Sequence, residues 1–182
     1  CLVGSEMCIR DSLRDAKGEF YFLEVNPRVQ VEHTVTEALT GFDLVSLGIR
    51  VAAGESLPIS QDEIHLRGHA IQARINAERP EDFTPAPGRI WECILPSGPG
   101  IRVDSHACSG YSMPTCFDSL LAKIIAHGSD RKVAIERLDA ALRETVLDGV
   151  ETLIPLHRKI LREPDFVNKE ITISYLEDHD FR

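Results

Sequence analysis

The sequence predicts an α+β fold in two parts, because of the order in which its strand and helix patterns follow one another. One strand pattern precedes two short helices, a polar connection over residues 55–66, and then several strands with helices behind them. The chain has 182 residues, 43% of them hydrophobic, which is enough for one domain with a real core or for two small domains. We therefore expect parts at 13–66 and 67–182. Residues 1–12 follow neither the strand nor the helix period of apolar side chains, and we expect this head to be foreign to the protein or disordered.

The first part is expected to open with a strand and to continue into helices. Residues 19–25 are rich in aromatic and branched side chains, which favours a strand. Thr34 and Glu37 have the spacing of a capping box, so a short helix is expected to open there and to stop at Gly41. Asp43 is expected to cap a second helix.

The second part is expected to hold most of the strands. Residues 69–76 alternate between two faces, with Arg74 on the polar one. Further strands are expected over 89–95, 101–104 and 121–127, separated by Gly/Pro turns. The helices expected after them run from a cap at Ser129 or Asp130 to Gly149, and over about 155–161.

Composition excludes several classes of partner. The net charge is −9, from 20 basic and 29 acidic residues, so the chain lacks the positive field that nucleic acid or an anionic membrane attracts. Its apolar runs are far shorter than the roughly 20 residues that span a bilayer. Five cysteines without a C-x-x-C pair favour free thiols in a reducing compartment, and so a cytoplasmic protein or one of an organelle matrix.

Every second residue from 24 to 32 is polar, and the residues between them are apolar. The polar residues are Glu24, Asn26, Arg28, Gln30 and Glu32. In an extended chain they would share one face. Such a face can line a site for a charged ligand, either a metal or an anion, or it can simply be solvated.

Glu24 and Asn26 offer hard oxygen ligands two positions apart. Mg²⁺ prefers one or two carboxylates together with water and substrate phosphate oxygens, so this pair suits a nucleotide-bound metal. The alternative is that both are ordinary hydrogen-bonding residues at the end of a strand.

Arg28 has a planar fork that suits a carboxylate-like anion, and Gln30 can add a donor. Glu32 can accept that anion's proton once Arg28 or a metal has acidified it. On a straight strand Glu24 and Glu32 would lie about 26 Å apart, so we expect Pro27 to break the strand and the segment after it to curl back. Arg74 is the other candidate, with a surface ion pair as its alternative role.

Four segments resemble one family in the right order. They are 20–37, 67–78, 111–123 and 148–152, and they closely resemble the biotin carboxylase component of biotin-dependent carboxylases, in the ATP-grasp superfamily. The resemblance implies that 13–66 is the C-terminal piece of an ATP-grasp domain. It also implies that 67–182 is the biotin carboxylase C-terminal domain, a small mixed or antiparallel sheet with helices.

The resemblance also implies a role for each polar residue of the first part. Glu24 and Asn26 would hold Mg²⁺ or Mn²⁺ on ATP, with Glu24 binding the cofactor. Arg28, Gln30 and the backbone of Val31 would bind bicarbonate.

Two residues would then act in the reaction itself. Glu32 would take the proton of bicarbonate, which attacks the γ-phosphate of ATP and gives carboxyphosphate. Arg74 would stabilise the enolate-like oxygen of biotin while the biotin nitrogen is carboxylated.

The implied partners are a biotin carboxyl carrier domain or protein, a carboxyltransferase, and a second copy that meets the segment Pro96–Arg102. A second magnesium carboxylate is missing around Arg10, Asp11 and Ser12, and the family's N-terminal domain and glycine-rich lid are absent. We therefore expect this fragment to be inactive alone. Two alternatives stay open: a non-catalytic dimerisation or binding module, and a carbamoyl-phosphate synthetase-like ATP-grasp ligase, which shares the Glu-x-Asn-Pro-Arg stretch.

Overall fold

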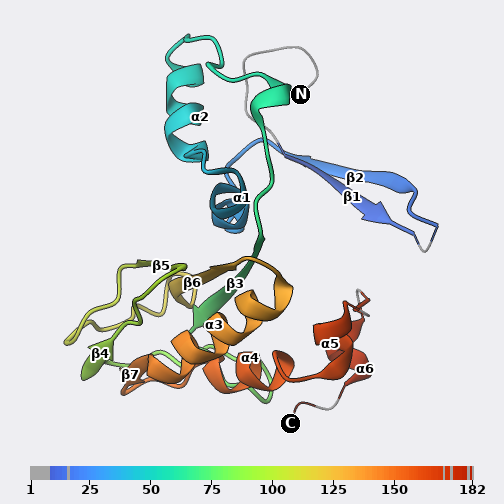
Figure 1. Ribbon diagram of the computed structural model, residues 1–182. Coiled ribbons are helices and arrows are strands. Elements are labelled where there is room, and N and C mark those ends of the chain that lie inside the picture. Colours follow the sequence, from blue (N-terminus) through green and yellow to red (C-terminus); the bar gives the residue numbers. More distant parts are fainter. Residues whose placement is uncertain (1–8, 16, 170, 173, 180, 182) are drawn as a thin grey trace. The chain divides into compact units, whose positions relative to one another are not determined.

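The structure is a computed structural model that describes residues 9–182 except 16, 170, 173, 180 and 182. The chain divides into two compact units, the first ending at Arg67 and the second running from Gly68 to Arg182. Each unit has its own strands and helices (Figure 1).

The first unit opens with a β-hairpin. Strand β1 (Ile9–Arg14) pairs antiparallel with β2 (Phe20–Asn26), which confirms the strand predicted over 19–25. Residues 9–12 of the expected head thus belong to a strand, which the sequence pattern did not predict; residues 1–8 lie outside the described part. Phe20, Tyr21 and Phe22 are all more than half exposed, so apolar side chains lie open on both faces of β2.

Two short helices follow the hairpin, α1 (His33–Thr40) and α2 (Leu44–Ala52). Gly41 ends α1 in the left-handed conformation, with φ 78°, as predicted. The predicted cap at Asp43 is also confirmed, because its Oδ1 accepts a hydrogen bond from the Ser46 backbone N at 2.8 Å.

The predicted capping box at Thr34 and Glu37 is wrong. Helix α1 begins at His33, and its N-cap is Glu32, two residues before Thr34, without a side-chain cap hydrogen bond. The Glu37 carboxylate accepts instead from the Leu44 backbone N at 2.8 Å, so it joins α1 to the start of α2. The connection after α2 is polar as expected and contains one 3₁₀ turn, η1 (Gln61–Glu63).

The second unit is built on a three-stranded antiparallel sheet in the order β3-β6-β5. Its strands are β3 (His69–Asn76), β5 (Ile101–Ser105) and β6 (Leu120–Gly128), which confirms three predicted strands. A separate two-stranded sheet pairs β4 (Glu92–Ile94) with β7 (Val146–Asp148). The strand predicted over 89–95 is therefore only three residues long, and β7 was not predicted.

The helices that the structure describes in the second unit are α3 (Arg131–Glu144), α4 (Ile154–Ile160), α5 (Pro164–Asn168) and α6 (Tyr175–Asp178). Of the two caps that the sequence predicted, Ser129 or Asp130, the Asp130 carboxylate caps α3 by accepting from the Val133 backbone N at 3.0 Å. The expectation that this helix continues to Gly149 is wrong, because the backbone becomes extended at Thr145 and then pairs with β4. No helix in the described residues is long and apolar enough to cross a membrane.

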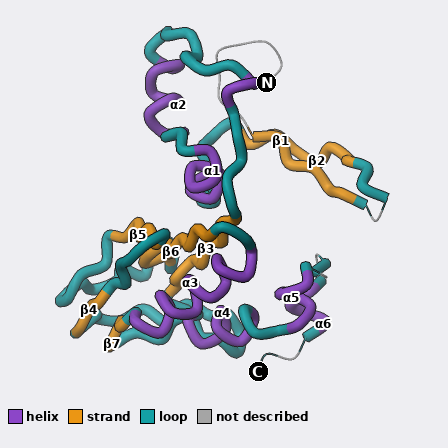
Figure 2. The backbone as a smooth tube through the Cα atoms, viewed as in Figure 1, coloured by secondary structure: helices purple, strands orange, loops and turns teal. Residues whose placement is uncertain are grey.

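The core of the second unit lies between α3 and one face of the sheet. Helix α3 packs across β6 and β3 (Figure 2). Ile75, Ile124, Leu138 and Leu142 are almost completely buried there. Because side chains alternate along each strand, Arg74 of β3 lies on the opposite face of the sheet, together with the buried Leu121 and Ile125 of β6.

Gly68 stands at the start of the second unit, directly before β3. Its φ is 67°, a conformation that residues with a side chain rarely adopt. A Cβ at this position would also collide with the backbone oxygen of Gly128 at the end of β6. Two independent constraints thus require glycine here.

Replacing Leu138 by Ala should lower the free energy of unfolding by about 2–5 kcal/mol, because the truncation leaves a cavity under α3. Urea denaturation of the full chain measures the change. Glu136→Ala on the exposed side of the same helix is the control and should cost less than about 1 kcal/mol. Equal losses in both variants would contradict the packing described here.

Candidate functional site

The end of β2 brings Glu24 and Asn26 together. Both project from the same face of the strand, and the Asn26 Nδ2 donates to the Glu24 Oε1 at 3.4 Å. Glu24 is exposed and Asn26 is partly buried. The predicted pair of oxygen ligands is therefore present as neighbours at the strand end.

The chain leaves the strand at Pro27, which confirms the predicted break. Arg28 is exposed, and its Nη1 donates to the Val29 carbonyl at 3.4 Å. Gln30, in contrast, is only 9% exposed. The alternation of polar and apolar side chains along one extended face thus ends at Asn26, and Gln30 no longer faces the same way as Arg28.

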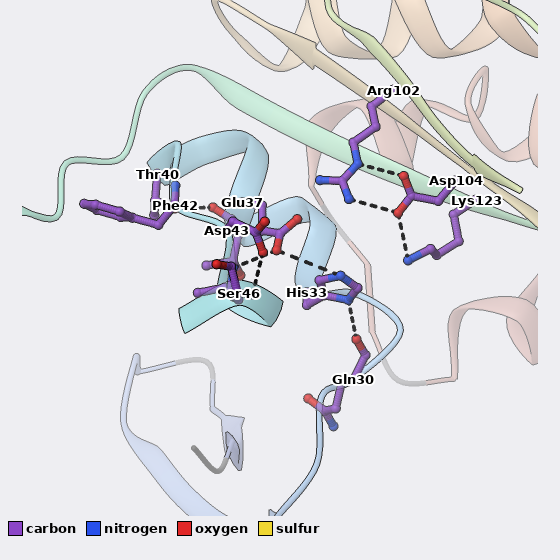
Figure 3. A network of polar contacts seen from close by, with 12 residues as sticks. Gln30, His33, Glu37, Thr40, Phe42, Asp43, Ser46, Arg102, Asp104 and Lys123 are labelled. Carbon is purple, nitrogen blue, oxygen red and sulfur yellow. Dashed lines mark hydrogen bonds and ion pairs between the residues drawn. The ribbon is translucent and has the colours of Figure 1, made fainter. Parts of the chain in front are cut away.

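The loop then turns at Val31 and Glu32 into α1. The Glu32 carbonyl accepts the first helical hydrogen bond, from the Val35 backbone N at 3.0 Å, and its side chain is exposed. The His33 Nδ1 donates to the Gln30 carbonyl at 2.8 Å, while its Nε2 lies 4.0 Å from the Glu37 Oε1 (Figure 3). The His33 backbone N also donates to the Gln30 carbonyl, at 3.2 Å, so His33 links the loop to α1 through two hydrogen bonds.

Arg74, the candidate in the second unit, lies in the middle of β3. It is exposed and stands opposite Lys123 of β6, which in turn stands opposite Asp104 of β5. Directly opposed residues of antiparallel strands have Cβ atoms about 5 Å apart and share a face. Arg74, Lys123 and Asp104 therefore form one row across the sheet, on the face away from α3.

Two cations converge on the carboxylate of Asp104. The Lys123 Nζ lies 3.2 Å from its Oδ2, and the Arg102 Nε and Nη2 donate to it at 2.8 and 3.0 Å (Figure 3). Partial burial raises the pKa of Asp104, but the hydrogen bonds from Arg102 and Lys123 outweigh it and hold the pKa below its usual value. Arg74 adds a further positive charge to this row.

The sequence did not single out Lys123 and Asp104. Both lie in segments predicted as strands, but their place beside Arg74 depends on which residues of β3, β5 and β6 face each other. That register comes from non-local pairing, and Lys123 gives no local signal, because its neighbours on the same face of β6 are the buried Leu121 and Ile125.

The donor set on β2 fits a magnesium ion that a nucleotide also holds. Among the described residues, no three His, Cys, Asp or Glu side chains come together as a metal cage. One carboxylate and one amide oxygen are nonetheless what Mg²⁺ takes from a protein when phosphate and water complete its shell. The three described cysteines, Cys93, Cys108 and Cys116, are free thiols, as predicted; Cys1 and Cys8 lie outside the described part.

The predicted site residues thus fall into two sets. Glu24, Asn26 and the loop through Glu32 belong to the first unit. Arg74 and its row belong to the second. Glu24, Arg28, Glu32 and Arg74 are exposed, whereas Gln30 is buried and Lys123 and Asp104 are partly buried.

Two family models match the chain. Residues 72–178 match the "Biotin carboxylase C-terminal domain", and residues 3–60 match the "Carbamoyl-phosphate synthase L chain, ATP binding domain". The second match begins at residue 3 and so includes most of the head.

Known proteins resemble the chain over most of its length. It is 51% identical over 160 residues to a biotin carboxylase of Allochromatium vinosum, which covers 88% of this chain and 36% of that protein. It is 46% identical over 169 residues to a chloroplastic biotin carboxylase of Arabidopsis thaliana, which covers 92% of this chain and 32% of that protein. The chain therefore spans about a third of the length of these relatives.

A solved structure shows the same likeness in three dimensions. It is the biotin carboxylase domain dimer of the Hydrogenobacter thermophilus 2-oxoglutarate carboxylase, in complex with MgADP, ADP and bicarbonate. The TM-score is 0.91 at 43% identity, over 94% of this chain and 38% of that one.

Replacing Asp104 by Asn should destabilise the protein by about 1–2 kcal/mol near pH 7, because Lys123 and Arg102 lose a shared carboxylate. A carboxyl group whose pKa is lowered in the folded state stabilises the fold above its unfolded pKa and ceases to do so as the pH falls through the folded value. The difference in free energy of unfolding between wild type and Asp104→Asn should therefore narrow as the pH falls below 3.8. Urea unfolding at a series of pH values measures it, with Glu92→Gln, on exposed β4, as the control. If this difference in free energy of unfolding does not narrow at low pH, the lowered pKa assigned to Asp104 is wrong.

Proposed function

The chain belongs to the biotin carboxylase family, and from this premise we propose that it forms part of an ATP-dependent ligase that carboxylates carrier-bound biotin with bicarbonate. Residues 13–66 are then the C-terminal piece of the ATP-grasp domain, and residues 67–182 are the biotin carboxylase C-terminal domain. The division of the chain between Arg67 and Gly68 supports this assignment. The 182 residues alone do not complete the reaction.

The observation that carries the proposal is the end of β2. Glu24 and Asn26 are in contact on an exposed strand end, and the chain passes from them at once into a loop with Arg28 and Glu32 exposed. Oxygen ligands, a guanidinium and a carboxylate therefore follow one another within nine residues, outside the hydrophobic core.

In this proposal Glu24 and Asn26 hold the magnesium (or manganese) ion that accompanies ATP. The metal neutralises charge on the phosphates when it is bound. Arg28 holds bicarbonate through its planar fork, while Gln30 and the backbone of Val31 complete the binding of that anion.

Glu32 acts as the general base. It accepts the proton of bicarbonate, and the bicarbonate oxygen then attacks the γ-phosphorus of ATP, with ADP as the leaving group and carboxyphosphate as the product. Pairing of the anion with Arg28 makes that proton easier to remove, which is why a carboxylate suffices as the base.

Arg74 acts in the second half of the reaction. Carboxyphosphate breaks down to CO₂ and phosphate. The released phosphate takes the N–H proton of biotin, so that negative charge develops on the ureido oxygen, and the nitrogen then attacks CO₂. The Arg74 guanidinium stabilises that oxygen, and Lys123 in the same row adds to the positive field.

The proposed partners are a biotin carboxyl carrier, a carboxyltransferase and a second copy of the chain in the cytoplasm or an organelle matrix. The related 2-oxoglutarate carboxylase domain is described as a dimer, which supports the homodimer. The segment Pro96–Arg102, which is exposed from Ser97 to Gly100, is the proposed contact. A carbamoyl-phosphate synthetase-like activity is less well supported, because the model that covers the larger part of the chain is the biotin carboxylase one.

Glu32→Gln in a full-length enzyme should lower bicarbonate-dependent ATP cleavage by about 10²–10⁴-fold, because the amide cannot accept the proton. A coupled assay of ADP release measures the rate. Glu19→Gln, exposed near the start of β2, is the control and should retain the wild-type rate. A Glu32 variant with normal ATP cleavage would refute the role as base.

Arg74→Ala in the same enzyme should lower biotin carboxylation by about 10²–10³-fold, because one oxyanion donor is lost. Bicarbonate-dependent ATP cleavage without biotin should change much less, since Arg74 acts after that step. Incorporation of labelled bicarbonate into biotin measures the first rate and ADP release the second. Arg50→Ala on exposed α2 is the control. Parallel loss of both rates would contradict the separation of the two steps.

A further inference from the structure

Helix α4 lies along the free edge of β3, the strand that carries Arg74. In the order β3-β6-β5, one edge of β3 pairs with β6 and the other is left without a strand partner in this sheet. Two carbonyls on that edge accept hydrogen bonds from α4 or its N-cap. The His157 Nε2 lies 2.8 Å from the Arg74 oxygen, and the Leu153 backbone N lies 3.2 Å from the Asn76 oxygen.

The bond from His157 is made to the backbone of Arg74 itself. A carbonyl oxygen can only accept, so the His157 Nε2 must carry the proton. The ring is partly buried, and burial lowers the pKa of His157, although the bond to the Arg74 carbonyl acts in the opposite direction. The neutral imidazole protonated at Nε2 is thus the form present near neutral pH.

This bond constrains the direction of the Arg74 side chain. Fixing the carbonyl fixes the peptide plane, and with it the Cα–Cβ vector from which the guanidinium projects toward the row with Lys123. The pairing with β6 fixes the strand from one side only. A displacement of about 1 Å in a group that stabilises a transition state can cost about 10²-fold in rate.

We propose that His157 is a positioning residue for the biotin half-reaction: through its hydrogen bond to the Arg74 carbonyl, it holds the Arg74 guanidinium where the oxyanion of biotin forms. The proposal rests on the proposed function of Arg74. It adds that helix α4, which contacts the free edge of β3, sets how well Arg74 stabilises that oxyanion.

Two variants in the full-length enzyme separate the hydrogen bond from packing. His157→Leu keeps the volume and removes the donor, and it should lower kcat for biotin carboxylation about 10-fold or more. Biotin-independent ATP cleavage should change less than about twofold. His157→Gln restores a donor of similar reach and should recover carboxylation to within about threefold of wild type.

Leu161→Ala is the matched packing control. Leu161 is 4% exposed at the C-terminal end of α4, so its truncation destabilises the unit but removes no hydrogen bond to Arg74. Its ratio of carboxylation to ATP cleavage should equal that of wild type. An equal drop in the ratio for Leu161→Ala, or a Gln variant no better than the Leu variant, would overturn the proposal.

Arg74→Ala, assayed in parallel, distinguishes failure of the positioning role of His157 from failure of the function proposed for Arg74. If Arg74→Ala loses carboxylation and His157→Leu does not, only the positioning role is wrong. If Arg74→Ala loses nothing, the function proposed for Arg74 is wrong, and the positioning role with it. Long-range ¹H–¹⁵N spectra of the wild-type protein give a test that needs no variant. They should show the His157 ring protonated at Nε2. A ring protonated at Nδ1 alone would have no donor for the Arg74 carbonyl and would contradict the proposal.

Discussion

The register between β3 and β6 is the constraint on which the second unit depends. It places Arg74 opposite Lys123 and Ile75 opposite Ala122. Because side chains alternate, a slip by one residue would move Arg74 into the core under α3 and expose Ile75. Burial of the apolar side chains against Leu138 and its neighbours therefore fixes the position of the charged row as well. The hydrophobic core and the charged row result from a single choice of pairing.

The two candidate sets are built by different means. In the second unit, pairing of β3 with β6 and a hydrogen bond from α4 define where Arg74 lies. In the first unit, an irregular loop between Pro27 and Glu32 carries the polar groups, and His33 of α1 ties the loop to that helix through the Gln30 carbonyl. Enzymes commonly carry charge-stabilising groups on rigid strands or helices and groups that bind a small anion on loops.

Local signals in the sequence predicted most of the elements. Pro27, Gly41, Asp43 and Asp130 each act through their own backbone or side chain, so their effects on strand end, helix end and helix cap could be predicted from the sequence. The capping box failed because Glu37 has a competing donor, the Leu44 backbone N, in the next helix. Strand β7 was not predicted, because three residues are too few to show the alternation of polar and apolar side chains that marks a strand. The row beside Arg74 and the role of α4 depend on pairing between distant segments, which no local pattern encodes.

Gly68 has a consequence for how this protein can vary. The polar stretch before it carries only one short 3₁₀ turn, and surface segments of this kind tolerate insertions and deletions at little thermodynamic cost. Gly68 itself tolerates no side chain, because of both its φ and the Gly128 oxygen. The connection over residues 55–66 can therefore change in length, in evolution or by design. Gly68, where it joins β3, cannot be replaced.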